Sequence, residues 1–423
     1  MNLILLAGVL TFCGQVKAQT ISITECYEWA RENYPQIHQH GLIDQTERYN
    51  LSNAGKAWLP QVSVNAKASY QSEVTKLPFD GKQISSMLPG AEIPVLSKDQ
   101  YQVVAQVDQA IWDGGSARSN RALTRAEATA NREQLESELY VVNNRVNQLY
   151  FGCLLQDELL RQNAILQKDL QTNIERIQSM MENGVANQSD LESMEVELLN
   201  VQQKAIELKA SRKAFRQMLS AFIAQPLTES TVLKTPDSPE TISTQINRPE
   251  LRALDARSAF LETQHKQLTA GLMPRLSAFV QGGFGRPGLN MLENGFEPFY
   301  IAGVRLSWNV GRLYTLKNDR RKIEVNRRTV DVQRETFLFN TRLQLLQQNT
   351  EIKKMTDLMR TDDSIIRLRS SIKNAAEVKL ENGVIAVTDL IREINAEDMA
   401  KQTAITHRVQ RLMSLYNYMY TTN

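Results

Sequence analysis

The chain has 423 residues, of which 42% are apolar and 23% are charged, and its formal net charge is +2. This composition excludes global disorder, and the length allows two or three ordinary domains or one large elongated one. A net charge so close to zero gives no basis for nucleic-acid binding.

Residues 1–18 predict a signal peptide. The run LILLAGVLTFC is apolar and short, and Val16 and Ala18 occupy the small-residue positions of a cleavage site. Phe12 stands where a lipid-attachment signal would need a small residue, which disfavours an anchor at Cys13. We expect export and cleavage after Ala18; the alternative is a buried N-terminal strand.

The rest of the chain contains no apolar run of the roughly 18 to 20 residues that a membrane helix needs. After cleavage only Cys26 and Cys153 remain, and they fall in different predicted helices. We therefore expect neither a transmembrane helix nor a disulfide framework.

The first half, residues 19–224, begins with a predicted helix at 24–56. Two strands follow, at about 58–76 and 99–113, because apolar residues alternate with polar ones there. In QVSVNAKASY the apolar set is Val62, Val64, Ala66, Ala68 and Tyr70. The second strand carries Tyr101, Val103, Ala105, Val107 and Ile111 on one face. Such a sheet is apolar on one side and wet on the other.

A very long helix is predicted at 116–183, followed by a return helix at 189–224. The segment lacks Pro, and its apolar residues recur in steps of three and four, which is typical of a coiled coil. At 1.5 Å per residue such a helix spans roughly 100 Å. We expect no compact domain around it.

The second half, residues 248–423, repeats this order after a linker at 225–247. Four landmarks recur in sequence, among them NYPQI as NRPEL and IWDGG as SWNVG. We expect a helix at 248–271, strands at about 273–285 and 299–311, a long helix at 312–382 and a return helix at 389–420. The chain is therefore predicted to be a duplicated supersecondary unit.

The two helix bends share a motif, ENGVANQSDL and ENGVIAVTDL. Gly184 and Gly383 stand where a helix ends in a left-handed residue, which glycine adopts without steric cost. Ser189 with Glu192 forms a capping-box pattern for the next helix, and Thr388 or Asp389 can cap its counterpart. Each bend then closes a helical hairpin.

Four amphipathic strands cannot close a barrel, since single-chain outer-membrane barrels begin at eight. A strand of 10 to 14 residues fits a tilted membrane crossing. We therefore expect a barrel that several copies of the chain share, which removes the open sheet edges. Two copies would give eight strands and three would give twelve.

The order of elements, the junction IWDGGSARSNRA and the two bends resemble the TolC-like outer-membrane efflux protein family. The resemblance covers essentially the whole mature chain. It implies a homotrimer in which a twelve-stranded outer-membrane β-barrel is continued by a helical coiled-coil barrel through the periplasm. It also implies docking on a periplasmic adaptor protein of an inner-membrane pump, in a tripartite efflux or type I secretion system.

By the same resemblance, four residues are expected at adaptor-docking tips: Gly184, Val185, Gly383 and Val384. Asp190 and Asp389 match acidic positions near the closed periplasmic entrance, although helix capping explains both equally well. The sequence departs from the family pattern at Arg392, where a second acidic gate residue is expected, and at Ile385, where some relatives have Arg. Three copies of Arg392 could partly cancel an anionic ring.

Six aromatic residues lie at or near the predicted strand ends, where an aromatic girdle would face the membrane interface. The alternative is that these six side chains pack against the middle of the molecule. They are Trp58, Tyr70, Tyr101, Trp112, Tyr300 and Trp308.

No catalytic or cofactor-binding pattern is present. His38 and His40 are two apart on a predicted helix and make a poor metal pair, and the sequence has no nucleophile motif or phosphate-binding glycine loop. We expect a passive duct and no enzyme. The alternative is a soluble periplasmic coiled-coil adaptor or a structural protein.

Overall fold

The computed structural model describes residues 20–75, 96–239, 243–291 and 293–423. The predicted signal peptide and most of the long loop after the first strand lie outside these residues. The chain divides into two compact units. The helical unit comprises the described parts of Met1–His40, Glu133–Ala253 and Arg334–Asn423; the sheet unit comprises those of Gly41–Arg132 and Leu254–Gln333.

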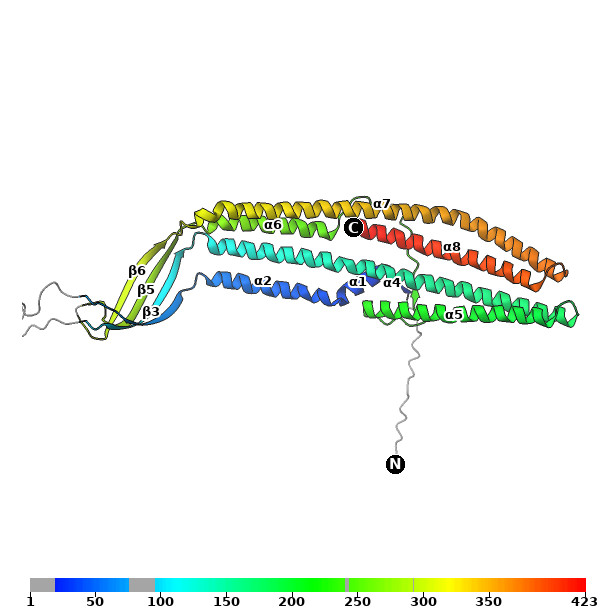
Figure 1. Ribbon diagram of the computed structural model, residues 1–423, viewed down its shortest axis with the longest axis horizontal. Helices are drawn as coiled ribbons and strands as arrows, with labels where there is room; N and C mark the ends of the chain where they lie inside the picture. The colour runs from blue at the N-terminus through cyan, green and yellow to red at the C-terminus, as the bar shows by residue number, and fades with distance from the viewer. Residues whose placement is uncertain (1–19, 76–95, 240–242, 292) are drawn as a thin grey trace, which may run out of the picture. The chain divides into compact units, whose positions relative to one another are not determined.

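Long helices make up most of the helical unit. They are α4 (Ser116–Glu182), α5 (Gln188–Ile223), α7 (Arg312–Glu381) and α8 (Val387–Thr422), of which α4 and α7 also contribute to the sheet unit. In Figure 1, α4 meets α5 and α7 meets α8 at tight bends.

The expected single helix at 24–56 is wrong. The structure has α1 (Ile23–Asn33), a 3-10 turn η1 (Pro35–His38) and α2 (Gln39–Lys56). Pro35 lacks the N–H that would continue the α-helical hydrogen bonds, and Tyr34 before it is extended, with φ −69° and ψ 126°. The helix therefore stops at Asn33 and restarts after one turn.

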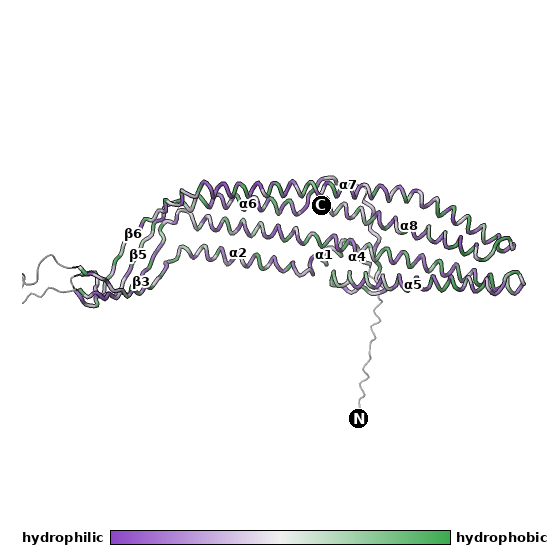
Figure 2. Tube along the Cα trace, viewed as in Figure 1, coloured by the Kyte–Doolittle hydropathy of each residue, from purple (hydrophilic) through white to green (hydrophobic). Residues whose placement is uncertain are grey.

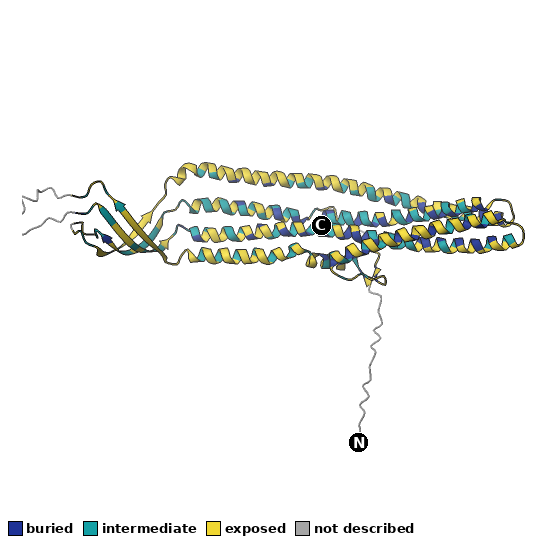
Figure 3. Ribbon diagram, turned by 60° about the horizontal axis from the view of Figure 1, so that its bottom comes forward, coloured by how far each residue is buried: buried dark blue, intermediate teal, exposed yellow. Residues whose placement is uncertain are grey.

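The seam predicted on α4 forms a core of the helical unit. Val142, Val146, Leu149 and Cys153 are all buried, and they pack with residues of α1, α5 and α8. A second cluster lies towards the bends and joins Leu170 and Ile177 of α4 to Met194 of α5 and Leu390 of α8. Figure 3 shows buried residues concentrated in the helices of the helical unit, and exposed or half-buried residues on the strands.

A four-stranded antiparallel sheet defines the sheet unit. Its strands are β2 (Gln61–Tyr70), β3 (Asp99–Trp112), β5 (Arg275–Arg286) and β6 (Glu297–Ser307), in the order β2-β3-β5-β6. Helix α6 (Pro249–Ala270) precedes β5, and its Leu261 packs against Ile323 and Val330 of α7.

Several strand ends differ from the prediction. Strand β2 stops at Tyr70 instead of continuing to residue 76, and β6 stops at Ser307, so Trp308 lies beyond it. The pairing of β3 with β5 shifts between Ala110 and Trp112, where a bulge places Trp112 opposite Leu276. The strict alternation that was expected to continue to Ile111 is interrupted there.

A pair of two-residue strands was not predicted. Strand β1 (Thr20–Ile21) pairs in parallel with β4 (Val232–Leu233), inside the predicted linker. The hydroxyl of Tyr150 on α4 lies 2.8 Å from the carbonyl oxygen of Ile21 and 2.7 Å from that of Lys234. Strands this short carry no periodic signal, so sequence patterns do not reveal them.

Among the described residues, no helix combines the length and the apolar character needed to cross a membrane. Figure 2 shows apolar positions recurring singly along the helices, between polar ones.

Candidate functional site

One face of the sheet is apolar across all four strands. Cross-strand pairing sets Val64 opposite Ala105, Ala105 opposite Gly282, and Gly282 opposite Tyr300. Because directly paired residues share a face, this register aligns the apolar sets of the four strands. The members of this face include Val62, Val64, Val103, Val107, Val280, Phe284, Val304 and Leu306.

This apolar face is exposed in the single chain. Val62 retains 69% of its accessible surface, Phe284 62% and Leu306 69%. A contiguous apolar surface of this kind marks a site of contact with protein or membrane. Among the described residues, β2 and β6 each have a strand on one side only, so both sheet edges are open as well.

The opposite face of the sheet is polar. Arg305 of β6 lies 3.6 Å from the carboxylate of Asp108 on β3 and 4.7 Å from the ring centroid of Phe279. Gln106 donates a hydrogen bond to Asp108 at 2.6 Å. The sheet therefore has the two-sided character predicted from the alternation.

The six aromatic residues fall in two groups. Trp58, Trp112 and Trp308 flank the strand ends that adjoin the helices, and Tyr70, Tyr101 and Tyr300 lie towards the opposite ends. All six are between 41% and 79% exposed. From Tyr101 to Trp112 the strand rises about 36 Å, or about 25 Å when tilted by 45°, the height of the apolar band of an outer-membrane barrel.

Both helical bends have the conformation expected of their glycines. Gly184 has φ +75° and Gly383 has φ +70°. The N–H of Val185 donates to the carbonyl of Met180 at 2.9 Å, and that of Val384 donates to Lys379 at 2.8 Å. These bonds satisfy carbonyls at the helix ends, as in a Schellman motif. Val185 and Val384 are 58% and 68% exposed.

The expected cap at Ser189 and Glu192 is wrong. The N-cap of α5 lies two residues earlier: it is Asn187, and Asp190 completes the capping box. On the second hairpin the carboxylate of Asp389 accepts a hydrogen bond from the N–H of Ala386 at 3.3 Å. Both aspartates considered for the entrance are thus helix-capping residues in this chain.

Arg392 forms ion pairs with two residues of its own helix, α8. Its guanidinium lies 3.3 Å from Asp389 and 3.3 Å from Glu393, and Glu393 also lies 3.4 Å from Arg369 of α7. Arg392 is 70% exposed, so these contacts are weak. The structure places Arg392 beside the acidic residue whose charge it was expected to offset.

Sequence patterns missed a second stripe on α7. On this helix the sequence predicts a seam of apolar residues seven apart, and all of them are only half-buried: Leu338, Leu345, Ile352, Met359 and Ile366. Residues seven apart on another face are widely exposed. They are Val325, Val332, Phe339 and Leu346. On α2, Leu42 and Tyr49 repeat the same spacing, and both are 59% exposed. The seven-residue spacing was the available signal, but α7 carries it on two faces.

Comparison with known proteins finds a family model that matches part of the chain. Residues 26–225 match the family described as Outer membrane efflux protein, which confirms the resemblance inferred from the sequence motifs. A comparison with curated protein sequences returned no significant match.

The fold is that of solved outer-membrane channels. The outer-membrane channel OprN is similar with a TM-score of 0.67 at 13% identity, over 95% of this chain and 90% of that one. The Campylobacter jejuni CmeC outer membrane channel has a TM-score of 0.63 at 13% identity, with 95% and 85% covered. The outer membrane protein VceC of Vibrio cholerae has a TM-score of 0.63 at 11% identity, with 94% and 95% covered.

Proposed function

We propose that this chain, whose residues 26–225 match the outer membrane efflux proteins and whose fold is that of outer-membrane channels, is the exit duct of a tripartite efflux or type I secretion system. It conducts substrates passively from a periplasmic adaptor and an inner-membrane pump to the outside. The observation that carries the proposal is the exposed apolar sheet face with two open edges.

The sheet supports a shared barrel in the outer membrane. An unpaired strand edge cannot be satisfied in lipid, so a membrane sheet must close. Four strands per protomer and three protomers give twelve strands. The apolar face then contacts lipid, and the two groups of aromatic residues lie at the two interfaces.

The exposed helical stripes support a cyclic homotrimer. Each protomer offers two different apolar stripes: α7 with Val332 and Phe339, and α2 with Leu42 and Tyr49. Two different surfaces on one chain generate a head-to-tail contact, which closes into a ring when the rotation between neighbouring copies divides a full turn evenly. We propose that the α7 stripe of one copy packs on the α2 stripe of the next, so that the helices of three copies form a coiled-coil barrel.

We assign adaptor docking to the bends. Gly184 with Val185, and Gly383 with Val384, present exposed apolar tips on short, well-capped turns. Asp190 and Asp389 lie a few residues from these tips, and in a trimer they would place carboxylates around the periplasmic entrance, with Arg392 beside Asp389. A ring of carboxylates at a narrow mouth favours cations.

We propose further that the chain is exported after removal of residues 1–18. Internal duplication accounts for the recurring order of elements.

Fractionation separates this function from that of a soluble periplasmic adaptor. We expect the full-length protein in the outer-membrane fraction, extracted only by detergent, with a mass of three chains by light scattering after correction for detergent. Val64→Lys with Val280→Lys, on the apolar face, should abolish membrane assembly, whereas Ser63→Lys on the polar face should not. A monomer that is stable in buffer without detergent would exclude the duct.

A further inference from the structure

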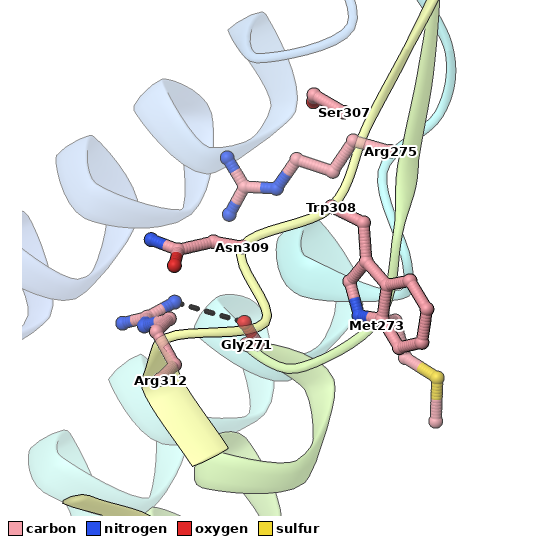
Figure 4. A pocket seen from close by; sticks show the side chains of 7 residues that line it. All are labelled: Gly271, Met273, Arg275, Ser307, Trp308, Asn309 and Arg312. Carbon is pink, nitrogen blue, oxygen red and sulfur yellow. Dashed lines mark hydrogen bonds between the residues drawn. The ribbon is translucent and has the colours of Figure 1, made fainter. Parts of the chain in front are cut away.

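A cavity of about 430 Å³ lies where β5 and β6 meet the helices of the sheet unit. Arg275, Ser307, Trp308, Asn309 and Arg312 are among its lining residues. Figure 4 shows the guanidinium groups of Arg275 and Arg312 on one side of the strands with the amide of Asn309 between them, while Trp308 and Met273 point to the other side.

The register assigns Arg275 to the polar side of the sheet, and Arg312 follows as the first residue of α7. Arg275 pairs with Ser307, and the next pair, Leu276 with Leu306, belongs to the apolar face. Because neighbouring residues of a strand point to opposite faces, Arg275 points away from the apolar face. A ligand of this cavity therefore comes from the solution that the polar face contacts.

Arg275 differs from the other arginines of the sheet. Arg286 lies 3.6 Å from the carboxylate of Asp99, and Arg305 lies 3.6 Å from that of Asp108. Within the described part of the chain, Arg275 has no carboxylate within 4.0 Å. Arg312 donates one hydrogen bond to the carbonyl of Gly271 at 2.9 Å, which leaves most of its N–H groups available.

The matching junction of the first half supplies its own anion. There Asp113 accepts hydrogen bonds from the N–H groups of Gly115 at 2.9 Å and Ala117 at 2.6 Å. Asn309 occupies the corresponding place in SWNVG and is neutral. The second junction thus has two cationic side chains and no carboxylate at the position of Asp113.

The surrounding helix adds to this positive charge. Residues 312–328 contain seven Lys or Arg side chains and two carboxylates. Both carboxylates already lie near cations of the same helix: Asp319 is 3.8 Å from Lys322, and Glu324 is 3.5 Å from Arg328. Asp319 lines the adjoining hollow of about 280 Å³, which also contains Arg275 and Arg312. The positive potential therefore extends beyond the cavity itself.

We propose that Arg275 and Arg312 bind a small solute anion of the phosphate or carboxylate class, with Asn309 and Ser307 as further hydrogen-bonding groups. Guanidinium forks match the paired oxygens of these anions. The proposal deepens the duct function and rests on it for one point, that the bound anions belong to the cargo. In a trimer the site occurs three times on the polar side of the barrel and attracts anions at this point of the duct, whereas the carboxylates proposed for the entrance favour cations.

Binding is tested first on the purified full-length protein in detergent, with inorganic phosphate as the probe at constant ionic strength. We expect Arg275→Gln and Arg312→Gln each to raise the phosphate dissociation constant about tenfold or more, because each removes a charge-assisted contact. Arg305→Gln is the matched control: it removes one positive charge from the same face of the sheet, outside the cavity. Its dissociation constant should stay within about twofold of the unsubstituted chain.

Three binding outcomes overturn the site. If all three substitutions weaken phosphate binding equally, binding depends only on the overall positive charge of this face and not on a specific site. No saturable phosphate binding by the unsubstituted chain would exclude the site directly. An anionic phospholipid that co-purifies with the unsubstituted chain and is lost from Arg275→Gln, without phosphate binding, would assign the arginines to a lipid headgroup instead.

Ion selectivity then tests the link to transport. In planar bilayers under a KCl gradient, Arg275→Gln with Arg312→Gln should lower the chloride-to-potassium permeability ratio, and Arg305→Gln should lower it less. The permeability ratio could stay unchanged in the double variant while phosphate binding follows the pattern expected above. That result would keep the binding site and reject its role in ion selectivity. If no variant forms channels while phosphate binding follows the expected pattern, the duct function fails and the anion site stands.

Discussion

Asn187 and Asp190 cap the start of α5 reciprocally. The side-chain oxygen of Asn187 accepts a hydrogen bond from the N–H of Asp190 at 3.0 Å, and the carboxylate of Asp190 accepts one from the N–H of Asn187 at 3.1 Å. The pair satisfies two backbone donors that the helix itself cannot use. Asp190 therefore has a structural role that operates whether or not it also lies at an entrance.

Replacing Asn187 separates capping from gating. Asn187→Ala removes the acceptor for the Asp190 N–H and keeps the carboxylate, so the first turn of α5 should lose about 1 kcal/mol. Amide exchange at residues 188–191 should then be about fivefold faster. Asp190→Asn keeps an acceptor but removes the charge, so it should change exchange less and ion selectivity more. If both variants leave selectivity unchanged, Asp190 has no part in a gate.

The bends provide a test of backbone conformation. Nothing lies within 4 Å of a Cβ built on Gly184 or Gly383, so only the positive φ opposes a larger residue there. Gly383→Val should destabilise the bend by about 1 to 2 kcal/mol, whereas Gly383→Asn should be tolerated because Asn adopts the left-handed region more readily. We expect the Val variant to assemble but to export poorly in cells, and the Asn variant to export normally. Normal export by both would separate the bend from docking.

Local chemistry explains what the sequence could predict. The glycine bends, the long α4 helix and the alternating strands each depend on neighbouring residues, and their positions follow from 3.6- and 2-residue periods. The cap was misplaced because Ser189 with Glu192 and Asn187 with Asp190 have the same spacing. The exposed stripe of α7 was missed because its heptads run on two faces, and only packing decides which one the chain buries.

Contacts between distant segments had no sequence signal. Arg248 is 7% exposed and lies 4.9 Å from the ring centroid of Tyr140 and 4.7 Å from that of Tyr420. Its Nε donates to Glu250 at 2.9 Å. The partners Arg248 and Tyr420 are 172 residues apart, so only the folded chain brings them together.

Arg248→Lys should therefore destabilise the C-terminal end of α8. A lysine keeps the charge but loses the planar stacking and the forked hydrogen bonds, which we expect to cost about 2 kcal/mol. The matched control is Arg252→Lys, because Arg252 is 61% exposed and its carboxylate partner is 3.5 Å away. In urea unfolding of the purified proteins, the midpoint should fall below that of the unsubstituted chain for Arg248→Lys and not for Arg252→Lys. Equal midpoints would mean that the aromatic contacts of Arg248 contribute nothing measurable.

Asp398 makes stability depend on pH. This carboxyl on α8 is 6% exposed and accepts a hydrogen bond from Gln162 at 2.8 Å and another from Gln402. Burial raises the pKa of Asp398 above its usual value, despite the two amide donors. Because the folded chain holds this proton more tightly than the unfolded chain, the stability contributed by Asp398 is present at low pH. It is lost as the pH rises through the raised pKa.

Asp398→Asn should remove that dependence. Above the raised pKa we expect the variant to have a higher urea midpoint than the unsubstituted chain, and below about pH 4 the difference should vanish. At neighbouring Glu397 the pKa shift has the opposite sign. Burial there is outweighed by hydrogen bonds from Ser370 and Lys401, so the pKa of Glu397 is lowered and its contribution is lost on acidification. Asp357→Asn, at a carboxylate that is 70% exposed, is the control. A midpoint difference that does not vary with pH would exclude the titration of Asp398 as the cause.

The two cysteines should resist modification until the helical unit opens. Cys26 of α1 and Cys153 of α4 are both fully buried in one core cluster. Burial raises the pKa of each thiol to about 12. At pH 8 the reactive thiolate is then about a thousandfold scarcer than for an exposed cysteine. We expect no alkylation by iodoacetamide in the native protein and complete labelling in denaturant, read by mass spectrometry. Ser189→Cys, at an exposed position, should label at once in the same sample. Rapid labelling of Cys26 or Cys153 would show that α1 separates from α4 in the native protein.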